Sequence, residues 1–166
     1  PRKRYVYLLD CPAASEALNA APLTVDSSGI YFRPEGRHFL SGLSPDEADE
    51  PGEMNWDVDY DWFDERIWPG LAARVPVFET LKVINAWTGH YDYNALDQNA
   101  VIGPHPDIGN FYFANGFSGH GLQQGPAAGN AIAELIAFGA YRTMDLSRLG
   151  YARVAAGEPL FEKNVI

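Results

Sequence analysis

The sequence predicts an α+β fold in which an antiparallel or mixed sheet carries flanking helices and is followed by a strand, a loop and a helix. Short strand-like segments joined by tight turns occupy the first part of the chain. An apolar pattern of helical period begins at Tyr60. Strand-like and helical segments then follow one another, which is typical of an α+β protein.

The first strands are predicted from their aromatic and aliphatic residues. Arg4–Leu9 forms the first, and PLTVD, GIYFRP and RHFLSGL form two or three antiparallel strands with turns at 27–29 and 34–36. The intervening CPAASEALNAA is built of small residues and is neutral toward helix formation. The acidic stretch SPDEADEPGEMNWDVDYD is predicted to be a solvated loop.

The middle of the chain changes from strand to helix and back to strand. A helix of three or four turns is predicted from Tyr60, interrupted or capped near Pro69. Further strands are predicted at Lys82–Tyr93 and Asn110–Ala114, with a short apolar piece, 100–103, before the second. The apolar residues that recur at helical spacing are Trp62, Phe63, Ile67, Leu71 and Val75.

The last long helix is predicted over Pro126–Phe138, with Pro126 in its first turn and Gly139 ending it. The tail DLSRLGYARVAAGEPLFEKNVI is predicted as a short helix and an extended end. The chain opens directly into strand-like residues without an initiator Met, and we therefore expect it to be a piece of a longer protein.

Composition excludes several function classes. A net charge of −10 argues against nucleic acid as a partner, because phosphate binding needs surplus Lys and Arg. The longest apolar runs are too short for a membrane span. Cys11 is the only cysteine, so no internal disulfide framework is predicted. No metal site is predicted either, because no ligand-type spacing relates the four histidines, His38, His90, His105 and His120.

The glycine-rich stretch FYFANGFSGHGLQQGPAAG is the strongest candidate for a binding site. A serine hydrolase is unlikely because His120 stands where the nucleophile elbow requires glycine. A dinucleotide fingerprint fails because its third glycine comes one position late, at Gly125. A strand, glycines and a helix start would still aim backbone N–H groups at an anionic ligand. The alternative is a tight strand–helix joint that binds nothing.

Two long motifs resemble those of the D-amino-acid oxidase/sarcosine oxidase superfamily of FAD-dependent oxidoreductases. GFSGHGLQQGPAAGNAIAEL resembles the C-terminal flavin-contacting motif of that family. AWTGHYDYNALDQNAVIG is similar to its Trp-x-Gly-x-Tyr segment with the following Asp and Ile-Gly, and GIYFRPEG resembles a strand of its substrate-domain sheet. The resemblance runs from Arg4 to Ile166.

The resemblance implies non-covalent FAD as the cofactor. Residues up to about 100 would form the substrate domain, and residues from about 101 to 166 the C-terminal strand–loop–helix of a glutathione-reductase-type FAD domain. The N-terminal half that grips the ADP part of FAD is missing from this chain. The residues that would contact the flavin are Gly89, Gly116, Phe117, Ser118, Gly119, His120, Gly121 and Leu122.

Three further residues are candidates for chemistry. By the resemblance, Tyr91 would contact substrate above the flavin, although a paired aromatic on a sheet face is the simpler alternative. Gln123 stands where monomeric sarcosine oxidases carry a lysine that promotes reaction with oxygen, which favours a dehydrogenase. Arg33 could clamp a substrate carboxylate, or could be a solvent-facing residue at a strand end before Pro34.

Other departures from the family narrow the chemistry. Gly89 stands where those oxidases have the cysteine that binds flavin covalently, so that bond is not possible here. Phe32 and Ser44 occupy the positions of a substrate-site tyrosine and histidine, which puts sarcosine itself in doubt as the substrate.

The resemblance implies oxidation of an amine or amino acid, of the sarcosine, dimethylglycine or D-amino-acid type, by hydride transfer to flavin. The expected partners are that small substrate, an electron-acceptor protein and the missing half of the chain, and the fragment alone is expected to be inactive. The compartment would be the cytoplasm in a bacterium and the mitochondrial matrix in a eukaryote. Two alternatives remain: an assembly or binding factor with a flavin fold, and a binding module without flavin.

Overall fold

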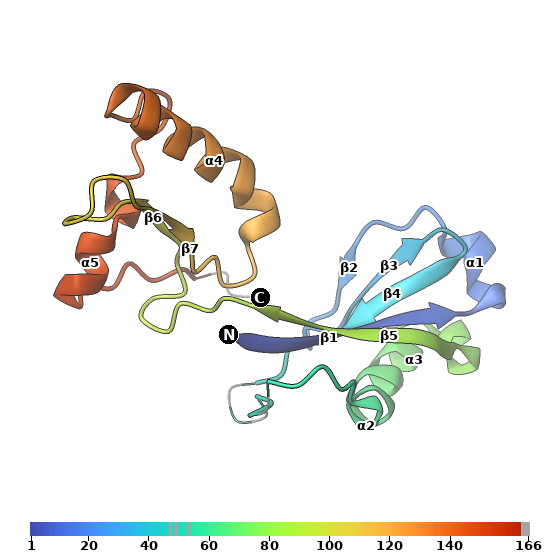
Figure 1. Cartoon of the computed structure of the whole chain (residues 1–166). Helices are drawn as coiled ribbons and strands as arrows, with labels where there is room; N and C mark the ends of the chain where they lie inside the picture. Colours follow the sequence, from blue (N-terminus) through green and yellow to red (C-terminus); the bar gives the residue numbers. More distant parts are fainter. Residues whose placement is uncertain (47, 49, 53, 164–166) are drawn as a thin grey trace. The chain divides into compact units, whose positions relative to one another are not determined.

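The computed structural model describes residues 1–46, 48, 50–52 and 54–163, and the chain divides into two compact units (Figure 1). The first, called here the sheet unit, is Arg2–His90. The second, called the loop unit, is Tyr91–Ile166 together with Pro1. The boundary near residue 100 between a substrate domain and a flavin-contacting segment stays a prediction. No helix in the described part of the chain is long and apolar enough to cross a bilayer.

The sheet unit is built on a five-stranded sheet with the order β2-β3-β4-β1-β5. Strands β1 and β4, β4 and β3, and β3 and β2 pair antiparallel, as predicted. The long first strand pairs with β4 through its C-terminal half, where Leu8 lies opposite Leu40. The strands are β1 (Arg2–Asp10), β2 (Thr24–Val25), β3 (Tyr31–Glu35), β4 (His38–Gly42) and β5 (Lys82–Tyr91).

One face of this sheet carries the core of the unit. Side chains alternate in β1, so that Tyr5, Tyr7 and Leu9 are buried while their neighbours are only partly covered. Phe78 is fully buried, and its ring lies 5.2 Å from the rings of both Phe32 and Phe39. Such edge-to-face aromatic packing stabilises a core beyond the area it removes from water.

Helices cover the core face. The segment CPAASEALNAA contains a helix, α1 (Pro12–Leu18), which begins with a proline and buries Ala14. The predicted helix from Tyr60 is confirmed as α2 (Tyr60–Trp62), a π-helical turn (Phe63–Ile67) and α3 (Trp68–Arg74). The π turn lies directly before Pro69, where an ordinary helical turn would press the proline ring against the carbonyl four residues earlier. A 3₁₀ turn follows at Pro76–Thr80.

The loop unit contains a two-stranded antiparallel sheet, β6 (Val101–Pro104) and β7 (Tyr112–Asn115), with Ile102 opposite Ala114. The helix α4 (Gly121–Phe138) follows, then a 3₁₀ turn (Ser147–Leu149) and α5 (Tyr151–Ala156). A small apolar core joins β6 to α4. Its buried members are Ala100, Ile102 and Ala128, and its partly buried members are Phe117, Ile132, Leu146 and Leu149.

The predicted start of α4 at Pro126 is wrong, because the helix begins at Gly121. Pro126 lies in the second turn and costs the helix one hydrogen bond, to the carbonyl of Leu122. A proline also disfavours helical geometry in the residue before it, partly through that residue's Cβ. Gly125 has no Cβ, which lessens this conflict. The predicted end is confirmed: Gly139 has φ +69° and donates its N–H to Leu135.

Glu134 fixes the chain that leaves α4. Its side chain is 8% exposed and accepts the hydroxyl of Thr143. It also accepts the backbone N–H groups of Arg142 and Thr143 and the amide of Asn130, at 2.7, 3.1 and 2.9 Å. The hydrogen bond from Thr143, followed by those backbone bonds, lowers the pKa of Glu134 to about 2.

The low pKa of Glu134 predicts an acid-sensitive contact. Its stabilisation is complete above the ordinary pKa of 4.5 and is lost as the pH falls from 4.5 to about 2. We therefore expect the melting temperature to fall more steeply over this interval in the wild type than in Glu134→Gln. The exposed Glu16, replaced by Gln, is the matched control and should follow the wild type. Equal slopes for wild type and Glu134→Gln would contradict the prediction.

Candidate flavin site

The glycine loop, defined here as residues 116–120 between β7 and α4, has an unusual backbone. Gly116, Ser118 and Gly119 all have positive φ, at +71°, +49° and +95°. Glycine adopts this region without cost, whereas Ser118 is one of the few other described residues there. At Gly116 a Cβ would also lie 3.3 Å from the Cβ of Asn94. The turn therefore depends on glycine at this position.

Asp92 holds the loop from the strand side. Its carboxylate accepts the N–H of Gly116, and its backbone carbonyl accepts the N–H of Ser118 at 3.0 Å. Asp92 directly follows Tyr91, the last residue of β5. The two motifs that carry the family resemblance are thus joined by one aspartate, although 24 residues separate it from Gly116.

Ser118 supports the loop from within. Its side chain is fully buried, accepts the N–H of Asn94 at 2.9 Å and donates to the carbonyl of Gly116 at 3.3 Å. The flavin contact expected for Ser118 is therefore not one that its hydroxyl can make. Phe117 is also turned inward, where it packs on the apolar core of the loop unit.

The surface that remains for a ligand is the start of α4. His120 precedes the helix and accepts the N–H of Gln124 at 3.0 Å, but no side chain caps the helix start. The N–H groups of the first helical residues have no partner within the helix, and they carry about half a positive charge. Leu122 is 90% exposed, and Gln123 and Gly119 are exposed beside it.

The predicted residues on β5 lie on an open part of the strand. A Cβ built at Gly89 would meet nothing within 4 Å. Tyr91 is partly buried, and its ring lies 6.5 Å from that of Tyr93. This pairing is the simpler role considered for Tyr91.

Arg33 is engaged at the strand end. Its guanidinium lies 2.6 Å from the carboxylate of Glu35, and both side chains are about half exposed, at 45% and 51%. It also donates to the carbonyl of Pro34. An arginine already neutralised by a neighbour is a poor clamp for a substrate carboxylate, and the geometry favours the solvent-facing alternative.

Phe32, which by the resemblance occupies the position of a substrate-site tyrosine, lies in the core of the sheet unit. Phe32 is 6% exposed and packs on Phe78 in the core. Strand alternation turns its neighbour Tyr31 to the other face of the sheet. There the Tyr31 ring covers Gly42, where a Cβ would lie 2.6 Å from the tyrosine hydroxyl. Burial raises the pKa of this hydroxyl.

A buried ion pair stands behind the loop. Asp97 is fully buried and accepts the Nε of Arg153 at 2.7 Å. Burial alone would raise the pKa of Asp97, but hydrogen bonds from Arg153 and from the backbone of Leu160 and Asn99 hold it below its ordinary value. Sequence reasoning assigned no role to Asp92, Asn94, Asp97 or Arg153. The one local signal was the run of Asp and Asn in DYNALDQN, which is typical of side chains that hydrogen-bond nearby backbone.

No group of three or more His, Cys, Asp or Glu side chains in the described part of the chain could hold a metal ion. At the loop, backbone N–H groups and a helix start are present, and such groups suit an anionic ligand.

Comparison with known proteins agrees with this geometry. Residues 1–135 match the model of a family described as FAD dependent oxidoreductase. FAD-dependent oxidoreductase domain-containing protein 1 of Xenopus laevis is 50% identical over 168 residues, which cover 100% of this chain and 33% of that protein. The chain thus spans about a third of the length of this relative.

Solved structures show the same fold at low identity. The L-proline dehydrogenase of P. horikoshii matches with a TM-score of 0.78 and 23% identity, covering 96% of this chain and 42% of that one. The glycine oxidase of Geobacillus kaustophilus matches with a TM-score of 0.74 and 20% identity, covering 90% and 38%.

Proposed function

Because the chain belongs to the FAD dependent oxidoreductase family, we propose that its glycine loop and the start of α4 hold the flavin of FAD. In this proposal the chain is part of a longer protein, of the length of its relatives, called here the intact protein. The intact protein oxidises an amine or amino acid, and FAD, when bound, supplies the hydride acceptor.

The uncapped start of α4 carries this proposal. Negative charge settles on the ring of reduced flavin, and a helix start with free N–H groups stabilises such charge. Gly119 is exposed and leaves the backbone before His120 open to a flat ring, whereas a Cβ at Gly121 would contact Phe117 at 3.5 Å. The residues of the loop that are turned inward, Phe117 and Ser118, fix its shape. The residues present therefore fit the isoalloxazine half of the cofactor.

The substrate class is proposed from the neighbours and from the sheet. The two solved neighbours are by their titles an L-proline dehydrogenase and a glycine oxidase, and a small amino acid or amine is the substrate class that we propose for the intact protein. Tyr91, one residue from Asp92, is our candidate for the pocket wall. Tyr31 is the aromatic residue that β3 turns to the face opposite the core.

A dehydrogenase fits this chain better than an oxidase. Gln123 is exposed in the first turn of α4, where the oxidases that the sequence resembles carry a lysine. A neutral amide provides no fixed positive charge for superoxide formation. Electrons would then leave to a separate acceptor. For a eukaryotic intact protein, the compartment that we propose is the mitochondrial matrix, as the resemblance implies.

A second candidate is an assembly or binding factor that keeps the flavin fold with little or no catalysis. The ion pair between Arg33 and Glu35 favours it, because it occupies the arginine that could have bound a substrate carboxylate. The two candidates differ in whether an amine reduces the bound flavin.

The test uses the intact protein, purified and scanned for flavin absorbance in the visible range. Sarcosine, dimethylglycine, D-amino acids, L-proline and glycine are then added without oxygen. We expect one of them to bleach the flavin band, and we expect Tyr91→Phe to slow bleaching by about tenfold or more through a misplaced substrate. Tyr141→Phe is the matched control, because that hydroxyl lies over Gly103 in β6. Bound flavin that none of these compounds bleaches would favour the binding factor, and a protein without flavin would contradict the flavin site itself.

A further inference from the structure

The described residues beyond the family match are tied to the glycine loop. The family model ends at Leu135, so α5 and the extended tail that follows it lie outside the matched region. The tail, defined here as residues 158–163, runs back along residues 97–99. Leu160 donates its N–H to the Asp97 carboxylate at 2.9 Å, and Glu162 donates its N–H to the Asp97 carbonyl at 3.0 Å.

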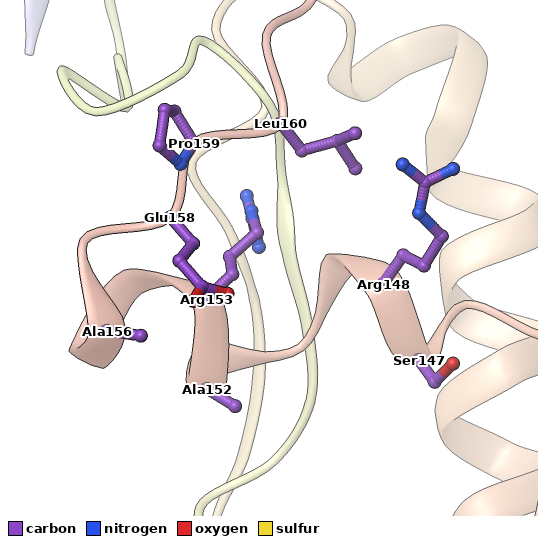
Figure 2. A pocket seen from close by; sticks show the side chains of 8 residues that line it. All are labelled: Ser147, Arg148, Ala152, Arg153, Ala156, Glu158, Pro159 and Leu160. Carbon is purple, nitrogen blue, oxygen red and sulfur yellow. The ribbon is translucent and has the colours of Figure 1, made fainter.

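Arg153 is the centre of this arrangement. Its guanidinium is 8% exposed and forms a two-pronged bond to Asp97, at 2.7 Å from Nε and 3.2 Å from Nη2. Its remaining donors satisfy backbone carbonyls on both sides: Leu149, Gly150, Asn99 and Ala100. Figure 2 shows Arg153 rising from α5, with Leu160 on the tail beside it.

The hollow in Figure 2 is not itself a candidate site. It has a volume of about 450 Å³ and is lined by Arg148 and Arg153, together with parts of α5 and the tail. Arg153 is fully used by Asp97 and the carbonyls, which leaves the exposed Arg148 as the lining cation. One exposed arginine does not make a binding site.

Asn94 connects the ion pair to the loop. Its side-chain amide donates to Asp97 at 2.9 Å and to the carbonyl of Asn99 at 2.7 Å. Its backbone N–H donates to the hydroxyl of Ser118, and that hydroxyl in turn donates to the carbonyl of Gly116. A continuous series of hydrogen bonds therefore runs from Arg153 through Asp97, Asn94 and Ser118 to the glycine loop.

We propose that Arg153, acting through Asp97 and Asn94, is a positioning residue for the glycine loop, so that α5 and the tail set how tightly the loop holds flavin. The effect on flavin rests on the proposed function, whereas the effect on the loop does not. The physical reason is that Ser118 has a positive φ of +49°, a conformation that only surrounding contacts maintain in a non-glycine residue. Asn94 supplies one of those contacts, and the Asp97–Arg153 pair fixes Asn94.

Asn94→Ala is the direct test, because it cuts the series and leaves the Asp97–Arg153 pair in place. Asn130→Ala is a close control. Asn130 also donates to a buried carboxylate at 2.9 Å, that of Glu134, but it does not belong to the series. Both variants are made in the intact protein, and both are assayed by flavin titration and by hydrogen exchange of the flavin-free form at residues 116–124.

In Asn94→Ala we expect flavin affinity to fall about tenfold, within the range found when hydrogen bonds behind a ligand shell are removed. Exchange of the Ser118, His120 and Gln124 amides should become faster at the same time. Asn130→Ala should bind flavin within about twofold of the wild type and should leave these amides unchanged. A similar melting temperature in the two flavin-free variants would separate positioning from a general loss of stability.

The proposal is overturned if Asn94→Ala leaves both the exchange rates and the affinity unchanged. It is also overturned if the affinity falls only in proportion to the unfolded fraction. If the wild type carries no flavin, the proposed function fails, but the exchange of the flavin-free loop still decides whether Asn94 positions it.

Discussion

Replacing Arg153 by alanine is expected to lower the free energy of unfolding of the intact protein by about 3 to 5 kcal/mol. The loss of stability arises from the groups that Arg153 leaves without a partner. Asp97 is fully buried and would keep its negative charge without the guanidinium that faces it at 2.7 Å. The carbonyls of Asn99 and Ala100 would lose a donor as well, at 3.0 Å each.

Chemical denaturation of the intact protein measures this loss, and two further variants interpret it. Arg148→Ala removes an exposed arginine from the preceding turn and is expected to change stability by less than about 0.5 kcal/mol. Asp97→Asn combined with Arg153→Ala removes the buried charge as well, so the double variant should be less destabilised than the sum of the two single ones. An effect of Arg153→Ala no larger than that of Arg148→Ala would show that the pair is not the stabilising element described here.

Acid should weaken the same contact. The pKa of Asp97 is held below its ordinary value of 3.8, so its ionised form is stabilised by folding. That stabilisation is complete above this pH and is lost as the pH falls through the lowered pKa. The pKa of Glu134 is lowered as well, so acid should weaken the contacts of both carboxylates in the loop unit.

Local pattern was sufficient for much of the fold. The first strand and the turns around β3 and β4 depend on a few neighbouring residues, and the sequence shows them directly. The helix from Tyr60 was found for the same reason, and its irregularity follows from one proline. The start of α4 was misplaced because the rule for Pro126 describes isolated helix starts, whereas Gly125 relieves the conflict here.

The candidate site, like the fold, could be predicted from the sequence only in part. The glycine loop could be recognised because its function depends on residue types that are contiguous in the sequence. The residues that hold it could not, because Asp92 and Arg153 act over separations of 24 and 56 residues, on Gly116 and on Asp97. Polar side chains of this kind look like surface residues until the fold shows that they are buried.

Substitutions of Arg153 and Asn94 are expected to change different properties of the protein. Arg153→Ala removes the partner of a buried charge, so its main effect is on unfolding. Asn94→Ala leaves that pair in place and removes the amide bonds to the Asp97 carboxylate and to the Asn99 carbonyl, so its main effect is expected on the loop. If both substitutions changed only the stability, the C-terminal segment would stabilise the fold without affecting flavin binding.

The second large effect is expected at Gly116, where alanine should weaken flavin binding by about a hundredfold. The backbone there has φ +71°, and a new Cβ would lie 3.3 Å from the Cβ of Asn94. A non-glycine residue in such a conformation is strained by about 1 to 3 kcal/mol, and the contact with Asn94 adds to this. We expect the loop to relieve the strain by moving away from Asp92, whose carboxylate binds the N–H of Gly116. The movement would displace the start of α4 from the ring it is proposed to face.

Flavin titration of the intact protein measures the effect, with Gly109→Ala as the matched substitution. Gly109 lies between β6 and β7 in the same unit, its φ is not positive, and a Cβ there would meet nothing within 4 Å. That variant should bind flavin as the wild type does, because an unstrained glycine in open space can accept a methyl group. Equal affinity of the two variants would mean that the flavin does not depend on the shape of this loop. The anion-binding role would then have to be sought away from Gly116, at the first N–H groups of α4 alone.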